Sequence, residues 1–237
     1  MATRELLRVR GIEKTSAPFR RELIRMSDRL EANPGYLAAV MSFETAGSFD
    51  PAQPHLGGGS ARGLIQFMPF VARKLGTTSA ELEQMTGVEQ LAFVEEYYRR
   101  VAGGRLNTIS DHYLAVFAPI GVGKPASAVM YRAPTKEYKM NKPLDKNGDG
   151  TITVGEAAAP VIGIVRAAED RAPLLVEMDV GPGARLARIA RAGAPTIVTS
   201  GVLGLRSRGG ELYKLGLVTL LAALAFGASR LARGAAA

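Results

Sequence analysis

Residues 41–54 of the chain read MSFETAGSFDPAQP, and residues 57–78 read GGGSARGLIQFMPFVARKLGTT. The first stretch ends an apolar segment with a single acid, Glu44. The second places an amide, Gln66, shortly after a run of three glycines. An acid on an apolar helix, followed by a glycine-rich turn and an amide, suits a site that acts on a polar, uncharged substrate such as a glycan.

A helix is expected to begin near Asn33, because Asn is a preferred N-cap and Pro34 suits the first helical position. The spacing i, i+3, i+4 and i+7 then puts four residues on one face: Leu37, Val40, Met41 and Glu44. A carboxyl on an apolar face loses hydration, so the pKa of Glu44 should rise. A glutamate with a raised pKa can serve as a general acid near neutral pH. The alternative is an ordinary helix-end Glu that is hydrogen-bonded to nearby backbone.

The glycine-rich stretch is expected to form a tight turn. Glycine tolerates positive φ and lets the backbone approach a ligand closely, which applies to the run at 57–59 and to Gly63. The Gln66 amide offers both a donor and an acceptor for sugar hydroxyl and acetamido groups. Taken alone, this stretch is equally typical of a loop that enters a helix.

Together, the Glu44-Thr pair, the Phe-Asp-Pro triplet at 49–51 and Gly-Leu-Ile-Gln-Phe-Met-Pro at 63–69 resemble the signature of the lysozyme-like lytic transglycosylases. The phage-borne peptidoglycan hydrolases are especially similar. The resemblance extends over about residues 17–160 and implies that Glu44 is the catalytic acid and base. It also implies that Gln66 lies in the glycan cleft.

Two further substrate-binding residues follow from the same resemblance. Ser60 is assigned to the cleft, although the spacing between Pro51 and Ser60 differs from the common one and Arg62 is not typical of that turn. Relatives often carry Ala-Tyr-Asn-Ala-Gly as a third motif. The nearest string here is YLAVFAP at 113–119, which makes Tyr113 the candidate cleft residue.

The reaction implied by the resemblance is cleavage of the β-1,4 bond between N-acetylmuramic acid and N-acetylglucosamine, with no catalytic cofactor. Glu44 protonates the leaving oxygen and then acts as base while the muramic 6-hydroxyl closes a 1,6-anhydro ring. A two-carboxylate mechanism needs a second acid across the bond. Asp50 is the nearest candidate, but Phe-Asp-Pro at 49–51 is more typical of a turn, so hydrolysis remains the alternative outcome.

Farther along the chain the pattern is helical. Thr78 and Glu81 have the spacing of a capping box. A helix after residue 87 is expected to bury a stripe and to carry ion pairs on its outer face. The stripe consists of Leu91, Val94, Tyr98 and Val101, and the pairs are Glu95–Arg99 and Glu96–Arg100.

Residues 145–156, DKNGDGTITVGE, match the twelve-residue calcium loop of an EF-hand. The expected Ca²⁺ ligands are Asp145, Asn147, Asp149, the Thr151 carbonyl and Glu156. Pro143 should shorten the entering helix and Pro160 should interrupt the exiting one. With a single loop of this kind, a structural Ca²⁺ is expected rather than a sensor. The alternative is an Asx-rich turn.

The composition excludes several other chemistries. The 237 residues include no cysteine, so neither disulfides nor thiol catalysis are expected. The two histidines, His55 and His112, have no metal-site spacing, and each is expected to be a loop or surface residue rather than a ligand.

Most of the net charge lies at the C-terminal end. Residues 180–237 contain eight Arg or Lys and one acid, Glu211, which accounts for +7 of the chain's net charge of +8. Two apolar runs follow one another there, at 195–205 and 215–228. The second covers only about 21 Å as a helix, less than the ~30 Å membrane core.

Three interpretations of this tail remain open: insertion into or adsorption on a membrane, burial in a larger assembly, and a helix of the chain's own core. Anionic lipid and other virion proteins are therefore candidate partners besides peptidoglycan. Nucleic-acid binding is disfavoured, because the arginines are not interleaved with aromatic residues.

The sequence thus predicts a mainly α protein with a lysozyme-like catalytic domain, an EF-hand-like loop and a helical, apolar and basic tail. The expected divisions are an N-terminal arm (1–16), the catalytic domain (17–144), the calcium loop with its following helix (145–172) and the tail (173–237). The N-terminus lacks the apolar segment of a secretory signal peptide.

Carriage in a phage particle, with action on the host cell envelope during genome delivery, is therefore the expected setting. Three alternatives remain: a muramidase that acts at lysis, a structural virion protein whose lysozyme fold binds glycan without cleaving it, and a mainly membrane-penetrating protein.

Overall fold

The computed structural model describes residues 2–55 and 57–178 of the chain. This part contains eight α-helices and four short strands, so the prediction of a mainly α protein is confirmed. The tail predicted at 173–237 is described only as far as Met178. Its basic stretch and its two apolar runs, at 195–205 and 215–228, lie outside the described residues.

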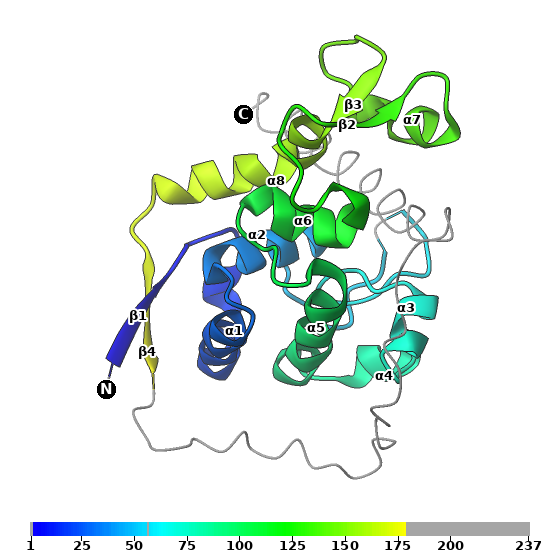
Figure 1. Ribbon diagram of the computed structural model, residues 1–237. Helices are drawn as coiled ribbons and strands as arrows, with labels where there is room; N and C mark the ends of the chain where they lie inside the picture. The colour runs from blue at the N-terminus through cyan, green and yellow to red at the C-terminus, as the bar shows by residue number, and fades with distance from the viewer. Residues whose placement is uncertain (1, 56, 179–237) are drawn as a thin grey trace, which may run out of the picture.

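The helices form a bundle around one core (Figure 1). Helix α1 packs against α2 and α5, and α8 crosses α6 and α2 on one side of the bundle. The helices are α1 (Ala17–Arg29), α2 (Pro34–Glu44), α3 (Pro69–Lys74), α4 (Ser79–Gln84), α5 (Gly87–Ala102), α6 (Ile109–Phe117), α7 (Lys136–Asn141) and α8 (Val154–Glu169). The strands are β1 (Ala2–Leu6), β2 (Val129–Arg132), β3 (Thr151–Thr153) and β4 (Leu174–Met178).

Two small antiparallel sheets attach peripheral segments to the bundle. Strand β1 pairs with β4, with Ala2 opposite Met178, so the two ends of the described chain lie side by side (Figure 1). Strand β2 pairs with β3 and, together with α7, forms a small lobe above the bundle. The residues expected to form an N-terminal arm contribute directly to the core, where Leu6, Val9 and Ile12 are at most 1% exposed.

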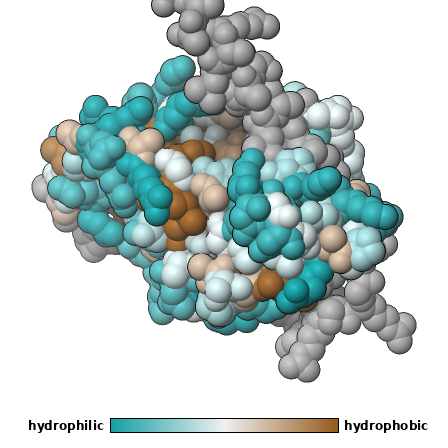
Figure 2. Space-filling view, turned by 90° about the horizontal axis from the view of Figure 1, so that it is seen from above, coloured by the Kyte–Doolittle hydropathy of each residue, from teal (hydrophilic) through white to brown (hydrophobic). Residues whose placement is uncertain are grey.

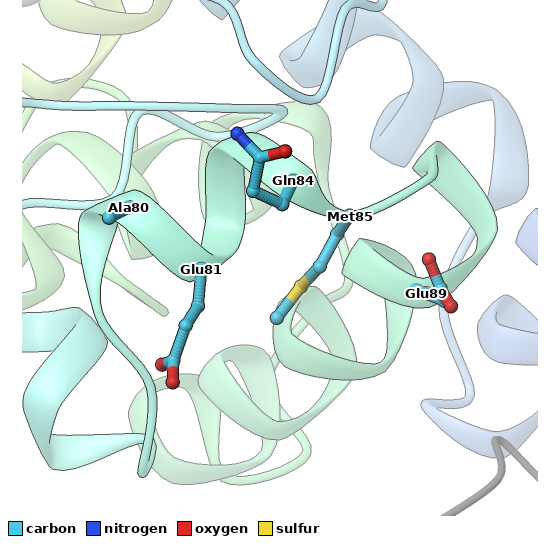
Figure 3. A pocket seen from close by; sticks show the side chains of 5 residues that line it. All are labelled: Ala80, Glu81, Gln84, Met85 and Glu89. Carbon is cyan, nitrogen blue, oxygen red and sulfur yellow. The ribbon is translucent and has the colours of Figure 1, made fainter. Parts of the chain in front are cut away.

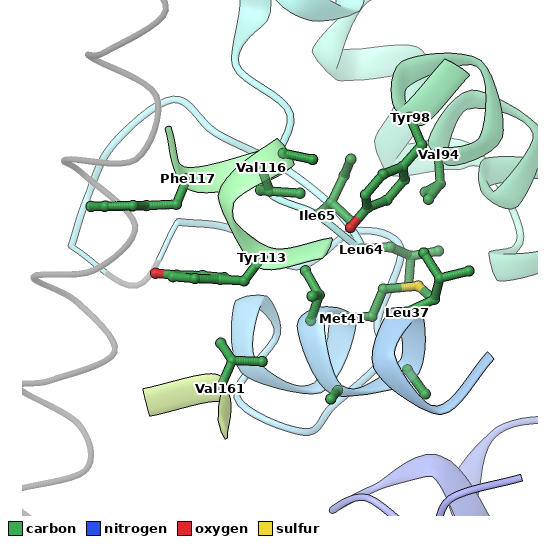
Figure 4. Packing of buried hydrophobic residues seen from close by; sticks show 14 of the residues in the cluster. Leu37, Met41, Leu64, Ile65, Val94, Tyr98, Tyr113, Val116, Phe117 and Val161 are labelled. Atoms are coloured by element: carbon green, nitrogen blue, oxygen red, sulfur yellow. The ribbon is translucent and has the colours of Figure 1, made fainter. Parts of the chain in front are cut away.

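Helix α2 begins and packs as its sequence predicts. Asn33 caps it by accepting hydrogen bonds from Gly35 N and Tyr36 N, and Pro34 occupies the first turn. Its predicted apolar face is buried, with Leu37, Val40 and Met41 at most 1% exposed. This face packs against α5 and α6 side chains, among them Tyr98 and Tyr113 (Figure 4).

Reciprocal capping boxes begin α4, α5, α6 and α8, and the box predicted at Thr78 and Glu81 is confirmed. The threonine N-caps are Thr78, Thr86, Thr108 and Thr153. Each box satisfies backbone donors that the first helical turn leaves open. A cap of this kind contributes about 1 kcal/mol to helix stability.

Helix α5 also follows its predicted pattern. Leu91, Val94 and Tyr98 are buried, and Val101 packs against the core from a partly exposed position. The two predicted ion pairs, Glu95–Arg99 and Glu96–Arg100, lie on the outer face at 2.6 and 2.7 Å.

The two prolines near the calcium-loop sequence differ in effect. Pro143 lies in a 3₁₀ turn at 142–144, and α7 before it is only six residues long, as expected. The expectation that Pro160 interrupts the following helix is wrong, because α8 continues through it to Glu169. A proline removes one backbone hydrogen bond, and burial of Ala157, Ala158 and Val161 on both sides of it keeps the helix in place.

Within residues 2–55 and 57–178, no helix combines the length and the apolar character that crossing a bilayer requires.

The N-terminal segment packs directly against the turn that follows α2. Substitutions at this contact should therefore lower the stability of the protein. Gly11 has φ +89°, and a Cβ there would lie 1.9 Å from Gly47 O. Gly11→Ala should lower the free energy of unfolding by about 3 kcal/mol or more. Gly76 has φ +81° and open space around it, so Gly76→Ala should cost only about 1–2 kcal/mol of backbone strain. Urea unfolding of both variants checks this, and equal losses would contradict it.

Candidate active site

Glu44 is the last residue of α2, and its carboxyl is enclosed in the core. The side chain is 3% exposed, and Oε2 has no hydrogen-bond partner among the described residues. Burial raises the pKa of Glu44 well above its ordinary value of 4.5, because desolvation penalises the charged form. This agrees with the expectation of a desolvated acid on the apolar face. The alternative was a helix-end Glu hydrogen-bonded to nearby backbone, and Oε2 makes no such bond to the described residues.

Three tyrosines from α5 and α6 lie within electrostatic reach of this carboxyl. Burial raises the pKa values of Tyr97, Tyr98 and Tyr113, and the charge of Glu44 raises them further. Tyr97 donates its hydroxyl to Ala115 O at 2.9 Å, and Tyr98 donates to His112 O at 3.0 Å. The hydroxyl protons of Tyr97 and Tyr98 are therefore already used in hydrogen bonds to backbone carbonyls of α6.

Tyr113, the predicted cleft residue, is fully buried on α6. Its ring stacks on Phe117 with centroids 5.4 Å apart and meets the edge of Phe43 at 5.4 Å (Figure 4). Its hydroxyl has no hydrogen-bond partner in the described part of the chain. Among the described residues, Glu44 Oε2 and the Tyr113 hydroxyl are thus two buried polar atoms whose hydrogen bonds a ligand or water would have to supply.

The turn after Glu44 is fixed by a side chain and by the N-terminal segment. Thr45 Oγ1 donates to Met41 O at 2.7 Å and accepts from Phe49 N at 3.0 Å. Arg10 donates to the Ala46 carbonyl from outside. Asp50 is exposed, and its Oδ1 accepts from Ala52 N at 2.8 Å, which is the turn role predicted for it.

Gln66 lies in a tight hairpin in which residues 62 and 67 exchange two backbone hydrogen bonds. It adopts φ +53° and is 3% exposed. Its Nε2 donates to Gln53 O and to Gly63 O, both at 3.2 Å. The amide nitrogen predicted to face the glycan cleft therefore holds the loop together, and only the amide oxygen remains for another role.

Arg62, which is atypical of the family turn, also fixes this hairpin. It donates to Gly59 O at 3.0 Å and to Ala61 O at 2.8 Å, and its guanidinium pairs with Glu83 of α4. Ser60 lies beside it, exposed.

Both histidines are buried, and the expectation of a loop or surface residue is met by His55 through its loop position and is wrong for His112. His55 does lie in a loop, but its Nδ1 accepts from Gly57 N at 3.0 Å and from Gly59 N at 2.9 Å. His112 lies in α6, where Nδ1 contacts Thr108 O at 2.7 Å and the ring meets Tyr36 edge-on. Each ring satisfies backbone groups, a role that residue spacing does not indicate.

The calcium-loop sequence forms a compact turn between α7 and α8. Asp145 accepts from Gly148 N at 2.7 Å, from Gly150 N at 3.0 Å and from the Tyr138 hydroxyl at 2.7 Å. The Tyr138 hydrogen bond lowers the pKa of Asp145, so this carboxyl stays ionised. Gly150, at the sixth loop position, has φ +79°, which only glycine adopts without strain.

The C-terminal end of the loop makes contacts that stabilise the surrounding fold. Glu156 Oε2 accepts from Thr153 N and from Thr153 Oγ1, which begins α8. Ile152 is fully buried opposite Tyr131 in the β2–β3 pair. In the part of the chain described, no three His, Cys, Asp or Glu side chains gather as a metal site.

Two surface depressions lie away from Glu44. One, of about 450 Å³, is lined by residues that include Glu81 of α4, Glu89 of α5 and Met85 between the two helices (Figure 3). Its two carboxylates are already the capping groups of those helices. The other, of about 170 Å³, lies between Lys14, Ser48 and Thr86.

The face that carries the small lobe shows an apolar patch bordered on both sides by hydrophilic surface (Figure 2). The described exposed apolar residues of the neighbouring segments include Ile120 and Met140, which are 47% and 38% exposed. Rims of polar residues around an apolar floor are typical of ligand-binding surfaces.

Comparison of the chain with protein-family models, with curated proteins and with solved structures gives no significant match.

The buried carboxyl makes a prediction about stability and pH. Folded Glu44 holds its proton to higher pH than the unfolded chain, whose pKa is near 4.5. This tighter proton binding contributes to the free energy of unfolding. The contribution is fully present below the unfolded pKa and is lost as pH rises through the folded pKa. The Gln side chain has no titrating carboxyl, so the Glu44→Gln variant should gain stability relative to wild type as pH rises above the unfolded pKa of about 4.5.

Urea unfolding of both proteins across this pH range measures the difference. Asp50→Asn makes the same chemical change at an exposed turn and should show no such trend. A stability difference between Glu44→Gln and wild type that stays constant with pH would contradict the buried-acid assignment.

Proposed function

We propose that the protein is a peptidoglycan lytic transglycosylase with a lysozyme-like catalytic domain, and that Glu44 is its acid and base. One observation carries the proposal: an enclosed carboxyl with a raised pKa and an unpartnered oxygen. A neutral carboxylic acid near pH 7 can donate a proton to a glycosidic oxygen. The resemblance of residues 44–69 to the family signature supports the same substrate class.

In the proposed reaction Glu44 donates its proton to the oxygen that leaves the muramic C1 carbon, and the C1–O bond breaks. The resulting carboxylate then removes the proton of the muramic 6-hydroxyl, whose oxygen forms the new bond to C1. The products are a free 4-hydroxyl and a 1,6-anhydro ring, and Glu44 is protonated again. A single carboxyl suffices for this sequence, which agrees with the exposed turn position of Asp50.

The loop that carries Gln66 is proposed as a wall of the glycan cleft. Its backbone is fixed by internal hydrogen bonds, so it presents a preformed surface. A rigid wall lowers the entropy lost when a glycan binds. Ser60, which is exposed, and Tyr113, which is fully buried, are proposed to keep the substrate-binding roles that the resemblance implies.

The 145–156 loop is proposed to bind one structural Ca²⁺. The described loop fits this in part: Asp145 and Asp149 are ionised oxygen donors, and Gly150 makes the required turn. Asn147, the Thr151 carbonyl and Glu156 would complete the set of Ca²⁺ ligands. Glu156 would then bind Ca²⁺ in addition to accepting the capping hydrogen bond from Thr153 N. Bound Ca²⁺ would supply only stability, because the loop belongs to the β2–β3–α7 lobe and not to α2.

We further propose that the protein is carried in a phage particle and acts in the host cell envelope, and that residues 180–237 hold it there. Seven of the eight net positive charges lie in that segment. Arginines near an anionic surface contribute about 1 kcal/mol each. Contact with other virion proteins would use the same residues.

Glu44→Gln should abolish cleavage of purified peptidoglycan without unfolding the protein. Loss of general acid catalysis lowers the rate by about 10²- to 10⁴-fold. Asp50→Asn is the matched control and should cleave at nearly the wild-type rate. Turbidity loss of a peptidoglycan suspension measures both variants. Near wild-type clearance by Glu44→Gln would refute the assignment, and binding without clearance by wild type would indicate a glycan-binding structural protein.

Calcium should raise the melting temperature of the wild-type protein, and a chelator should lower it. Binding to the native state alone contributes about 2.7 kcal/mol at a hundredfold excess over Kd. Asp145→Ala should remove the response, whereas Asp170→Ala, an acid outside the loop, should keep it. Identical melting curves with calcium and with chelator would leave only the Asx-turn interpretation.

A chain that ends at Met178 keeps β4 and its pairing with β1. It should therefore fold, cleave isolated cell walls and stay in solution in the presence of anionic liposomes. The full chain should float with the liposomes or remain with particle proteins. Equal partitioning of the two chains would contradict the role proposed for the tail.

A further inference from the structure

We propose that Gln90 is a positioning residue that fixes the loop at 51–67, and with it Gln66, to α4 and α5. Gln90 lies in the first turns of α5 and is fully buried. Its effect on glycan binding rests on the function proposed above. Its effect on the structure of the loop does not depend on that function.

The Gln90 amide makes three hydrogen bonds to three different segments. Its Oε1 accepts from Leu64 N at 2.7 Å. Its Nε2 donates to Pro51 O at 2.9 Å and to Leu82 O at 3.0 Å. The side chain therefore joins both ends of the loop to the end of α4, using both amide hydrogens and the amide oxygen.

The loop is shaped to receive this amide. Gly63 has φ +82°, and a Cβ at that position would lie 2.3 Å from Gln90 Oε1. The carbonyl of the same glycine accepts from Gln66 Nε2 at 3.2 Å. A single glycine thus lies between the buried amide of Gln90 and the amide of Gln66.

The contact is costly to break and has no substitute. All three partners are backbone groups, and a buried backbone group without a partner loses the full free energy of its lost hydration. Gln66 depends on the loop, because both hydrogen bonds that the structure gives its Nε2 are to loop carbonyls. Loss of the Gln90 contacts should therefore release Gln66, while Glu44 keeps its own position at the end of α2.

Gln90→Met and Gln90→Glu separate hydrogen bonding from packing. Met keeps the volume and loses all three hydrogen bonds. A protonated Glu can accept from Leu64 N and donate to one of the two carbonyls, whereas an ionised one cannot donate. Asn141→Leu is the control, because it removes one buried amide contact, to Glu137 O, in α7.

Hydrogen-exchange protection factors of the 51–67 amides in the full chain are the first measurement. Gln90→Met should lower them by about tenfold or more, given the three lost hydrogen bonds. Gln90→Glu should recover protection as pH falls and its carboxyl gains a proton, whereas Gln90→Met should not. Unchanged loop protection in Gln90→Met, or equal loss in Asn141→Leu, would overturn the inference.

Cleavage kinetics on solubilised glycan strands are the second measurement. Gln90→Met should raise KM severalfold and leave kcat near the wild-type value, because the loop binds substrate and Glu44 performs the chemistry. A looser loop with an unchanged KM would overturn the role in binding. Wild-type protein without any cleavage would instead refute the proposed function, and exchange alone would then decide whether Gln90 fixes the loop.

Discussion

The buried carboxyl of Glu44 is the constraint on which the rest of this structure depends. It ends α2 inside the core, where Oε2 has no hydrogen-bond partner among the described residues and three buried tyrosines lie within its electrostatic reach. Burying a charge there would be costly, so the fold is compatible with a neutral acid and disfavours a carboxylate. The surrounding elements maintain this enclosure: α5 and α6 supply the aromatic wall, and Thr45 with Arg10 fixes the turn that leads away. The same enclosure that lowers stability at higher pH keeps the Glu44 carboxyl protonated to a higher pH than the ordinary value of 4.5.

The chain beyond Glu44 is organised by buried polar side chains that bond to backbone rather than to each other. Gln66, Gln90 and His55 each satisfy two backbone groups of the loop at 51–67. A loop without regular secondary structure has no internal ladder, so side chains must supply its hydrogen bonds. Such a loop is rigid without being a helix or a strand, and a preformed wall of this kind suits the binding of an extended glycan.

Local signals in the sequence predicted α2, the start of α4, α5 and the helix after the calcium loop, but not α1, α3 or α6. The N-cap at Asn33, the apolar face of α2, the stripe of α5 and the capping box at Thr78 are short-range patterns, and all are present. The boxes at Thr86, Thr108 and Thr153 carry the same spacing and could have been predicted with them. Contacts between segments far apart in the chain could not be predicted from such patterns. The pairing of β1 with β4, the burial of both histidines and the role of Gln90 depend on segments far apart in the chain, for which a single sequence gives no pattern.

The proposed chemistry requires Glu44 to be a neutral acid at the pH where the protein would act. The most direct measurement is a carbon-13 NMR titration of the side-chain carboxyls in protein labelled at glutamate, with the Glu44 signal assigned by its loss in Glu44→Gln. This carboxyl should titrate at a pH well above 4.5, the ordinary value, and later than the exposed glutamates. A Glu44 signal that titrates at or below the ordinary value would contradict the buried acid and the mechanism built on it.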